Sequence, residues 1–306
     1  SWNINSIIIK PIVIVFLKMN NSHKHINVSL SIKDKIPGTY KKIPDYILGL
    51  IEKIILQDEM NSIIDQSSHL RGIEMVNWLI KHFGIKVKVR GHDLIPINDR
   101  NIFSANHPTG GLDGLCVISE IAKVNAKTRF IVNDLLKVVK GLESICIYIS
   151  RFGNINRKDA KSINDAFSSN INIVLHPAGS VSKRNPMRVC DLKWNKFFIR
   201  KAIQFERNII PVHINAYNSS LFYNIATLRK FFFIKSNFEM FLLPREMFNK
   251  KGHTLRITFG RPIPYSTFDR SKTDYEWAQK VREYVYLIGN KEYSSTEMIP
   301  DFNSLL

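Results

Sequence analysis

Residues 101–114 have the sequence NIFSANHPTGGLDG, which joins a short apolar run to a glycine-rich turn. The apolar run at residues 101–105 predicts a buried strand, and apolar residues at helical spacing predict a helix over residues 115–124. In α/β proteins a loop between such a strand and helix often carries the functional side chains, because the loop is exposed while its flanks are rigid.

This turn contains one imidazole, His107, and one carboxylate, Asp113. A histidine can accept a proton from a hydroxyl near neutral pH, and a nearby aspartate can hold its other ring N–H and stabilise the imidazolium. Pro108 and the glycines would let the chain turn tightly enough for the two side chains to meet. The alternative is that Asp113 caps the following helix and His107 is an ordinary loop histidine.

The chain beyond this turn alternates between short β-rich runs and helical segments. Such alternation predicts an α/β fold with a mainly parallel, mixed sheet flanked by helices. The predicted strands are residues 85–89, 102–105, 130–132, 145–149, 171–175, 209–214 and 254–259, and the predicted helices are residues 134–140, 159–168, 196–205 and 275–287.

The N-terminal part has a different pattern. Apolar residues recur at helical spacing over residues 43–64 and 69–83, so residues 1–84 are predicted as a helical region that could contact a membrane surface, and residues 85–306 as the α/β domain. Residues 7–17 are apolar, but Lys10 and Pro11 interrupt them and the run is shorter than the roughly 20 residues of a spanning helix.

The composition is strongly basic, with 44 Lys and Arg against 26 Asp and Glu and a net charge of +18. Such a balance favours an anionic partner: a membrane surface, an acidic carrier protein, a phosphorylated substrate or nucleic acid. Part of the charge could instead reflect nucleotide bias, because Ile and Asn are abundant as well. The cysteines at 116, 146 and 190 have no metal-type spacing and are predicted to be reduced core residues of a cytosolic protein.

Three further segments, each at the end of a predicted β-run, carry polar groups. They have the sequences GNINR at residues 153–157, HPAGSVSKR at residues 176–184 and IPVH at residues 210–213. Gly179 would let the backbone approach a ligand, and the hydroxyls and cations beside it suit a phosphate or an oxyanion. Each loop taken alone could be an ordinary turn.

Taken in order, the four loops resemble the four motif blocks of the glycerolipid (lysophosphatidic-acid type) acyltransferase superfamily. The blocks are NHPTGGLDG, GNINR, LHPAGSVSKR and IIPVHI, and the resemblance covers residues 87–264. The double glycine and the stretches VNDLLKVVKGLE and DLKWNKFFIRKAIQFERNIIPVHI are most similar to the hemolysin and glycerol acyltransferase branch.

The resemblance implies site residues. His107 and Asp113 match the catalytic pair, and Arg157 matches the arginine that holds the acceptor's anionic head group. The residues expected to bind substrate are Asn106, Gly110, Gly111, Asn156, Arg157, Gly179, Ser180, Lys183, Arg184 and Pro211.

Two departures from the family pattern affect this expectation. Five residues separate His107 from Asp113 where the family has four, so the turn at Gly110 must take up one residue. In the third block, Ala178 replaces the usual Glu and Val181 stands where Arg is common, which argues against a glycerol 3-phosphate type of head group unless Lys183 and Arg184 supply the lost charge.

The function that the resemblance implies is transfer of a fatty acyl group from acyl-CoA or acyl carrier protein to a hydroxyl of a lysolipid. The acceptor would be lysophosphatidate or a lyso-aminolipid, and neither metal nor redox cofactor would be needed. We expect a peripheral protein at the cytoplasmic face of the membrane, with no nucleic-acid partner. Residues 217–248, rich in Phe and Leu with interspersed cations, could dip into lipid or pack as core.

Two other classes of function remain open at this point. A metal-dependent hydrolase could use His107, Asp113, His176 and His213, since His and Asp suit zinc. A non-catalytic membrane- or nucleic-acid-binding protein would explain the charge, but it would leave the His–Asp turn without a role and has no recognised nucleic-acid motif.

Overall fold

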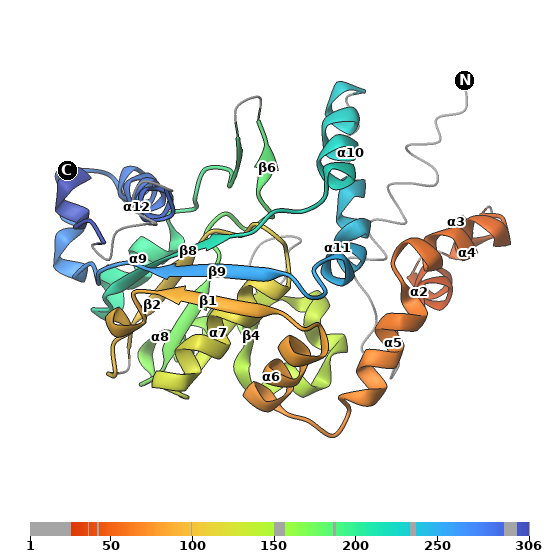
Figure 1. Ribbon diagram of the computed structural model, residues 1–306, viewed down its shortest axis with the longest axis horizontal. Helices are drawn as coiled ribbons and strands as arrows, with labels where there is room; N and C mark the ends of the chain where they lie inside the picture. Colours follow the sequence, from red (N-terminus) through yellow and green to blue (C-terminus); the bar gives the residue numbers. More distant parts are fainter. Residues whose placement is uncertain are drawn as a thin grey trace.

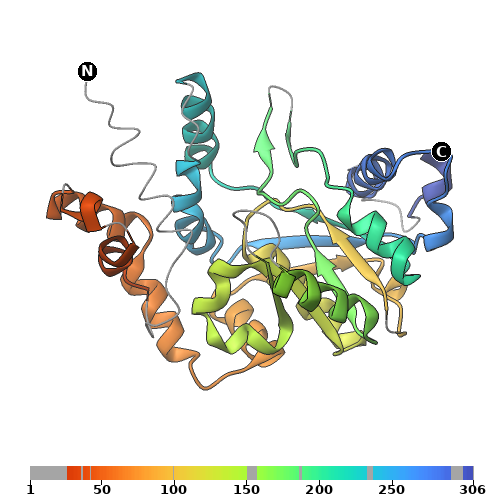
Figure 2. The ribbon, with the colours of Figure 1, turned by 180° about the vertical axis from the view of Figure 1, so that it is seen from behind.

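The computed structural model describes residues 26–35, 37–41, 43–98, 100–149, 157–185, 188–232, 237–290 and 299–305. The apolar run predicted at residues 7–17 lies outside these ranges. The described chain surrounds one seven-stranded sheet (Figures 1 and 2).

The sheet has the strand order β1-β9-β8-β2-β5-β3-β4. All neighbouring strands are parallel except β8 and β9, so β1 and β9 run opposite to the other five. The predicted mainly parallel, mixed sheet is therefore confirmed. Its strands are β1 (Lys86–Arg90), β2 (Ile102–Ala105), β3 (Thr128–Asn133), β4 (Cys146–Ile149), β5 (Asn172–Leu175), β8 (Ile209–Asn215) and β9 (Thr254–Phe259).

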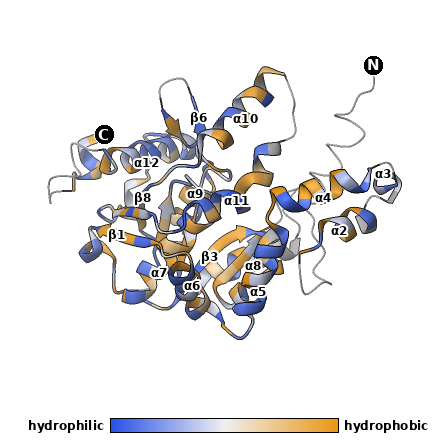
Figure 3. Cartoon of the chain, turned by 45° about the vertical axis from the view of Figure 1, so that its right-hand side comes forward, coloured by the Kyte–Doolittle hydropathy of each residue, from blue (hydrophilic) through white to orange (hydrophobic). Residues whose placement is uncertain are grey.

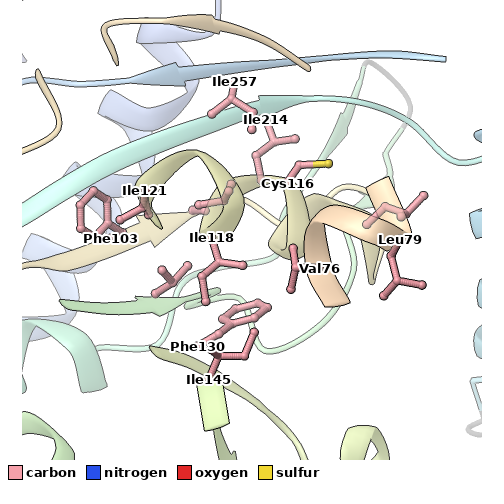
Figure 4. Close-up of a cluster of buried hydrophobic side chains, with 14 of the residues drawn as sticks. Val76, Leu79, Phe103, Cys116, Ile118, Ile121, Phe130, Ile145, Ile214 and Ile257 are labelled. Atoms are coloured by element: carbon pink, nitrogen blue, oxygen red, sulfur yellow. The ribbon is translucent and has the colours of Figure 1, made fainter. Parts of the chain in front are cut away.

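Helices cover both faces of this sheet, and alternate residues of each strand point to opposite layers. On one face, Phe103 of β2 belongs to an apolar cluster with α6 (Gly72–His82) and α7 (Leu112–Val124). Figure 4 shows part of this cluster, including Val76, Phe103 and Ile118. On the other face, Ile102 packs in a cluster with α8 (Arg157–Ser168), α9 (Phe197–Phe205) and α12 (Asp274–Ile288).

The helices before β1 divide by their packing. The apolar residues of α6 join the sheet's core, whereas α2 (Val28–Lys35) and α4 (Asp45–Ile54) bury a separate small cluster. α5 (Gln57–Gln66) contacts both, because its Ile63 joins the sheet's core while Met60 and Ile64 pack against the small cluster. The short helix α3 (Pro37–Tyr40) lies between α2 and α4 in the chain. The division into domains at residue 84 is not tested by this packing and remains a prediction.

Some elements differ from the sequence-based expectation. Residues 134–140, predicted as a helix, form the 3₁₀ turns η3 (Asp134–Val138) and the start of η4 (Lys140–Ile145). A two-stranded hairpin, β6 (Lys183–Arg184) with β7 (Val189–Cys190), and the helices α10 (Ser220–Phe231) and α11 (Leu243–Asn249) were not predicted. The remaining short turns are η2 (His92–Leu94), η5 (Phe238–Leu242), η6 (Tyr265–Thr267) and η7 (Phe302–Leu305).

Two simple sequence expectations can be compared with the described chain. All three cysteines are free thiols, and Cys116 and Cys190 are buried. Burial raises the pKa of Cys146 to about 12, so this thiol stays protonated at neutral pH. Among the described helices, none has the length and apolar character needed to cross a bilayer.

The strand order places the predicted motifs on one edge of the sheet. β8, β2 and β5 are adjacent and parallel, so their carboxyl ends meet side by side. The first block follows β2, the third follows β5, and the loop after β8 lies beside both. The second block follows β4, which is three strands from β2, a distance of about 14 Å at the usual strand spacing.

A buried arginine fixes the far end of α8, the helix that begins at Arg157. The Arg207 side chain is fully buried, and its guanidinium donates to the carbonyl oxygens of Phe167, Ser169 and Ile171 at 2.5–2.8 Å. These carbonyls belong to the end of the helix and the turn that follows it.

We predict that Arg207→Met lowers the free energy of unfolding by about 3 kcal/mol or more, because several buried carbonyls would lose their donors. The matched control is Arg200→Met, which removes an exposed ion pair with Asp274 and should cost about 0–1 kcal/mol. Denaturant unfolding of both variants measures the difference. Equal losses would contradict the role given to Arg207.

Candidate active site

The two side chains singled out in the first block are in contact. Nδ1 of His107 lies 3.1 Å from Oδ2 of Asp113. The Asp113 side chain is fully buried, whereas 19% of the His107 side chain is exposed. A fully buried carboxylate therefore contacts an imidazole that is partly exposed.

The Asp113 carboxylate accepts hydrogen bonds from several backbone N–H groups. Its Oδ2 accepts the backbone N–H groups of Thr109 (2.9 Å) and Gly110 (3.2 Å), and its Oδ1 accepts that of Gly114 (2.9 Å). Burial raises the pKa of this carboxyl, but the charge and hydrogen bond of His107 and the Thr109 N–H outweigh it, so the pKa lies well below its usual value. Asp113 is an anion at any physiological pH.

The turn between the two residues takes up the additional residue through glycine. Gly110 has a φ of +88°, in the region that favours glycine. A Cβ at this position would also approach Leu243 Cδ2 of α11 to 3.0 Å. The contact that the family pattern predicts therefore forms despite five intervening residues.

A second histidine, His176 of the third block, lies against the first. The rings of His107 and His176 are stacked, with centroids 4.0 Å apart and planes 18° apart. Nδ1 of His176 lies 3.1 Å from the carbonyl oxygen of Ala105, which can only accept, so His176 carries its proton on Nδ1. Burial and the neighbouring His107 lower the pKa of His176 to about 3, and the ring is neutral at pH 7.

A second buried carboxylate, Asp191, holds the backbone on the other side of His107. Oδ1 of Asp191 accepts the His107 backbone N–H (3.2 Å) and the Ser182 hydroxyl (2.5 Å), and Oδ2 accepts Nε1–H of Trp194 (2.9 Å). The backbone N–H of Ser182 donates in turn to the His107 carbonyl (2.7 Å). Asp191 thereby links the first and third blocks.

Helix α12 supports this carboxylate from behind. The Tyr286 hydroxyl accepts the Asp191 backbone N–H at 2.7 Å, and Arg282 donates to the Asp191 carbonyl at 2.6 Å. Burial raises the pKa of Asp191, against the lowering effect of the Ser182 and Trp194 donors. Through Asp191, a helix more than 80 residues away in the sequence thus contacts the loop that carries His107.

Of the four residues considered for a metal site, only three lie close together. Single ligand atoms of His107, Asp113 and His176 lie within 4.8 Å of one another. An imidazole binds metal through a lone pair in its ring plane, and two stacked rings direct these lone pairs alongside each other rather than toward a common point. His213 is elsewhere, with its ring packed against Tyr286. The arrangement suits a base with a neutral ring beside it better than a metal centre.

The third block forms one wall of a hollow beside the site. Gly179 has a φ of +62° and an exposed position, and its N–H closes a turn onto the His176 carbonyl (3.0 Å). This small hollow lies between the loop, α10 and η5. It is lined by Ser180, Val181, Ser182, Lys183, Phe222, Tyr223, Ala226, Asn237, Glu239 and Met240.

The wider sequence agrees with this geometry, because residues 30–295 match the protein family described as Acyltransferase. The chain belongs to this acyltransferase family. The match covers most of the chain, so the superfamily that the four blocks resemble is confirmed, whereas the hemolysin and glycerol acyltransferase branch remains a prediction.

Two relatives of this acyltransferase have names that describe an activity. Both are called lyso-glycine lipid O-acyltransferase. The protein from Bacteroides thetaiotaomicron is 36% identical over 262 residues, covering 85% of this chain and 96% of that protein. The protein from Phocaeicola vulgatus is 35% identical over 262 residues, covering 85% of this chain and 94% of that protein. The protein is an enzyme of acyl transfer.

One solved structure is also similar to this chain. The 1-acyl-sn-glycerophosphate (LPA) acyltransferase PlsC from Thermotoga maritima aligns with a TM-score of 0.43 and 14% sequence identity, covering 92% of this chain and 95% of that chain.

The predicted substrate-binding residues of the acyltransferase lie in different places. Gly110, Gly111, Gly179 and Ser180 belong to loops at the site. Asn106 uses both atoms of its amide to hold Ile214, donating to the carbonyl (2.9 Å) and accepting the N–H (2.6 Å), so it joins the ends of β2 and β8.

The other predicted residues lie farther from His107 or outside the described chain. Arg184 turns toward α10, where it donates to Asn224 at 2.9 Å, and Lys183 lines the hollow. Pro211 is buried inside β8, paired with Ser104. Arg157 begins α8, and Asn156 lies outside the described residues. The substrate contacts of all these residues remain predictions.

Sequence reasoning missed Asp191 and the stacked position of His176. Asp191 stands in the stretch DLKW, which carried part of the family resemblance but no recognisable chemical pattern. It is 84 residues from His107, and only the fold shows that the two meet.

We predict that Asp191→Asn lowers both stability and kcat. All three side-chain partners of Asp191 are donors, so an amide nitrogen in place of one oxygen would face a donor, which costs about 1–3 kcal/mol of unfolding free energy. The control is Asp274→Asn on the surface of α12. Thermal unfolding and steady-state kinetics measure both effects, and unchanged kinetics in a folded Asp191→Asn protein would contradict the role in holding the loop.

We also predict that His176→Phe keeps activity within about tenfold of the wild type. Phenylalanine preserves a flat neutral ring beside His107, and the loss of one hydrogen bond to Ala105 costs only about 1 kcal/mol. A metal ligand or proton-transfer group at this position would instead make the variant inactive. Initial rates of acyl transfer by the folded variant decide between these outcomes.

Proposed function

We propose that this acyltransferase moves a fatty acyl group from a thioester donor to the hydroxyl of a lyso-aminolipid, with His107 as the general base. The observation that supports it most is the contact between a partly exposed imidazole and a fully buried carboxylate at 3.1 Å. The two relatives named lyso-glycine lipid O-acyltransferase support an acceptor of this class.

In the proposed reaction, Nε2 of His107 takes the proton from the acceptor hydroxyl. The oxygen attacks the thioester carbonyl carbon, and a tetrahedral oxyanion forms. The C–S bond then breaks, and the imidazolium returns the proton to the leaving thiolate, so the products are an ester and a free thiol. General-base help of this kind contributes about 100- to 10 000-fold in rate.

Asp113 would serve this reaction in two ways. Its lowered pKa keeps it ionised, so its charge stabilises the imidazolium that forms during proton transfer. Its hydrogen bond to Nδ1 also leaves the basic lone pair on Nε2, at the outer edge of the ring.

The oxyanion needs donors near the third block. The Gly179 N–H is already used within its turn. Within the part of the chain that the structure describes, the N–H groups of Ser180 and Val181 have no acceptor, and they follow directly along the loop. We assign these two N–H groups to the developing oxyanion, where such donors act most strongly.

The head group of the acceptor follows from the altered third block. Val181 is buried against Phe222 and Tyr223, so the position where Arg is common provides packing rather than charge. A phosphate monoester carries a charge of about −2, whereas an amino-acid head group carries a single carboxylate and requires fewer cations. The lyso-aminolipid is therefore favoured over lysophosphatidate.

The donor would be acyl-CoA or acyl carrier protein. Both are anionic, in agreement with the net charge of +18. These donors and the lysolipid would meet at the cytoplasmic face of the membrane, where the enzyme would act as a peripheral protein.

We predict that purified enzyme acylates a lyso-glycine lipid when given labelled acyl-CoA or acyl carrier protein, and that His107→Ala lowers kcat about 100- to 10 000-fold with a small change in KM. The control is His253→Ala, an exposed histidine outside the site. Product is measured by the label in the diacylated lipid.

A panel that adds lysophosphatidate and other lyso-aminolipids tests the acceptor class in the same experiment. Preference for lysophosphatidate would contradict the assigned head group. Equal rates for wild type and His107→Ala would contradict the mechanism whichever acceptor is used.

A further inference from the structure

Helix α10 exposes large apolar side chains to solvent. Leu221, Leu228 and Phe231 are 48%, 57% and 72% exposed, and the flanking Tyr217 and Phe232 are 57% and 59% exposed. Positions 221, 228 and 231 are spaced by seven and three residues, so they lie on one face of the helix. These side chains form an apolar stripe, and the exposed Asn224 lies on the same face.

The opposite face of α10 is apolar as well, and it is packed against the protein. Phe222, Tyr223 and Ala226 are 3%, 2% and 6% exposed and line the hollow beside the third block. A surface helix of a protein that stays in water has one apolar face toward the core and a polar face outside. α10 exposes large apolar side chains on its outer side as well, and much of the helix is coloured as hydrophobic in Figure 3.

The exposed position of α10 is held firmly by buried polar contacts. The guanidinium of Arg229 pairs with Glu239 of η5 at 2.9 Å, with both side chains less than one-tenth exposed. At the other end, Glu246 of α11 accepts the backbone N–H (2.6 Å) and the hydroxyl (2.5 Å) of Ser219, just before α10 begins. The fold therefore presents the stripe outward in a fixed orientation.

A basic hairpin stands beside this helix. β6 and β7 project from the same side of the molecule as α10 (Figures 1 and 2), and Arg184 of β6 donates to Asn224 and lies over the Tyr223 ring. Arg184 and Arg188 are exposed. Residues 166–190 and 207–238 contain no Asp or Glu, so no acidic residue of these segments offsets the cations.

We propose that the outer face of α10 inserts into the head-group region of an anionic bilayer while the β6–β7 hairpin binds lipid head groups through its arginines. Apolar side chains on one element and cations beside them are the two features that bind a protein to such a surface. The inference rests on the proposed function in one respect, since an acceptor held in a bilayer gives the enzyme a reason to dock there.

This docking would bring the lipid acceptor close to His107. The loop of residues 180–183 lies between α10 and the catalytic turn, lining the hollow on one side and donating to the His107 carbonyl through Ser182 on the other. A lipid leaving the bilayer beside α10 would pass this loop before it reached His107. The stripe thus helps the lipid acceptor to reach the site and takes no part in the reaction itself.

The test measures binding of the full chain to vesicles without turnover. Wild type, the triple variant Leu228→Ser/Phe231→Ser/Phe232→Ser and the control Tyr46→Ser/Ile97→Ser/Tyr275→Ser are floated with vesicles of phosphatidylcholine alone or mixed with phosphatidylglycerol. The control removes three side chains that are 74%, 83% and 45% exposed elsewhere on the molecule. Thermal unfolding of each variant shows that it is folded.

Wild type and control should bind the phosphatidylglycerol vesicles and prefer them to phosphatidylcholine alone. The α10 variant should partition about 10- to 100-fold less, because three large apolar side chains no longer leave water. Equal binding by the folded α10 variant would overturn the proposal, as would failure of wild type to bind, for example because another segment of the chain covers the stripe.

A second readout separates this proposal from the proposed function. The α10 variant should acylate a short-chain acceptor dissolved as monomers at the wild-type rate, but lose rate on acceptor embedded in vesicles. Equal loss on both acceptors would overturn the docking role. An inactive wild type that still binds vesicles through α10 would instead contradict only the proposed acyl transfer.

Discussion

The Asp113 carboxylate accepts four hydrogen bonds in a place where no part of its side chain is exposed, and the loop of residues 107–113 depends on it. Three donors are backbone N–H groups of the turn and of the start of α7, so the carboxylate shapes the loop as well as holding His107. A buried anion is costly unless its acceptors are filled, and the turn fills them. The same interaction therefore explains the left-handed conformation at Gly110 and the orientation of the imidazole.

Much of the fold could be predicted from the sequence because its signals are local. β2, β5 and β8 are mostly apolar and buried along nearly their whole length, which is typical of parallel strands covered on both faces. The His107–Asp113 contact could be predicted for the same reason, since only five residues lie between the two in the sequence. α10 could not, because apolar residues on opposite faces weaken the helical period by which an amphipathic helix is recognised.

The rest of the site depends on contacts that no local pattern records. Asp191 meets the His107 backbone across 84 residues, and Asn106 joins β8 across 108. These contacts arise from strand order, since β8, β2 and β5 end side by side and α12 packs behind the third block. The sequence therefore predicts which groups react, whereas the fold determines what holds them. The stacked His176, kept neutral by burial, belongs to this second category.

The central claim is that Asp113 fixes the proton of His107 on Nδ1 and leaves Nε2 as the base. Nitrogen NMR of protein labelled with ¹⁵N-histidine measures this directly at neutral pH. The account predicts that His107 is protonated at Nδ1 and unprotonated at Nε2, and that this state is lost in Asp113→Asn. A His107 ring protonated at Nε2, or one whose tautomer does not respond to Asp113→Asn, would contradict it.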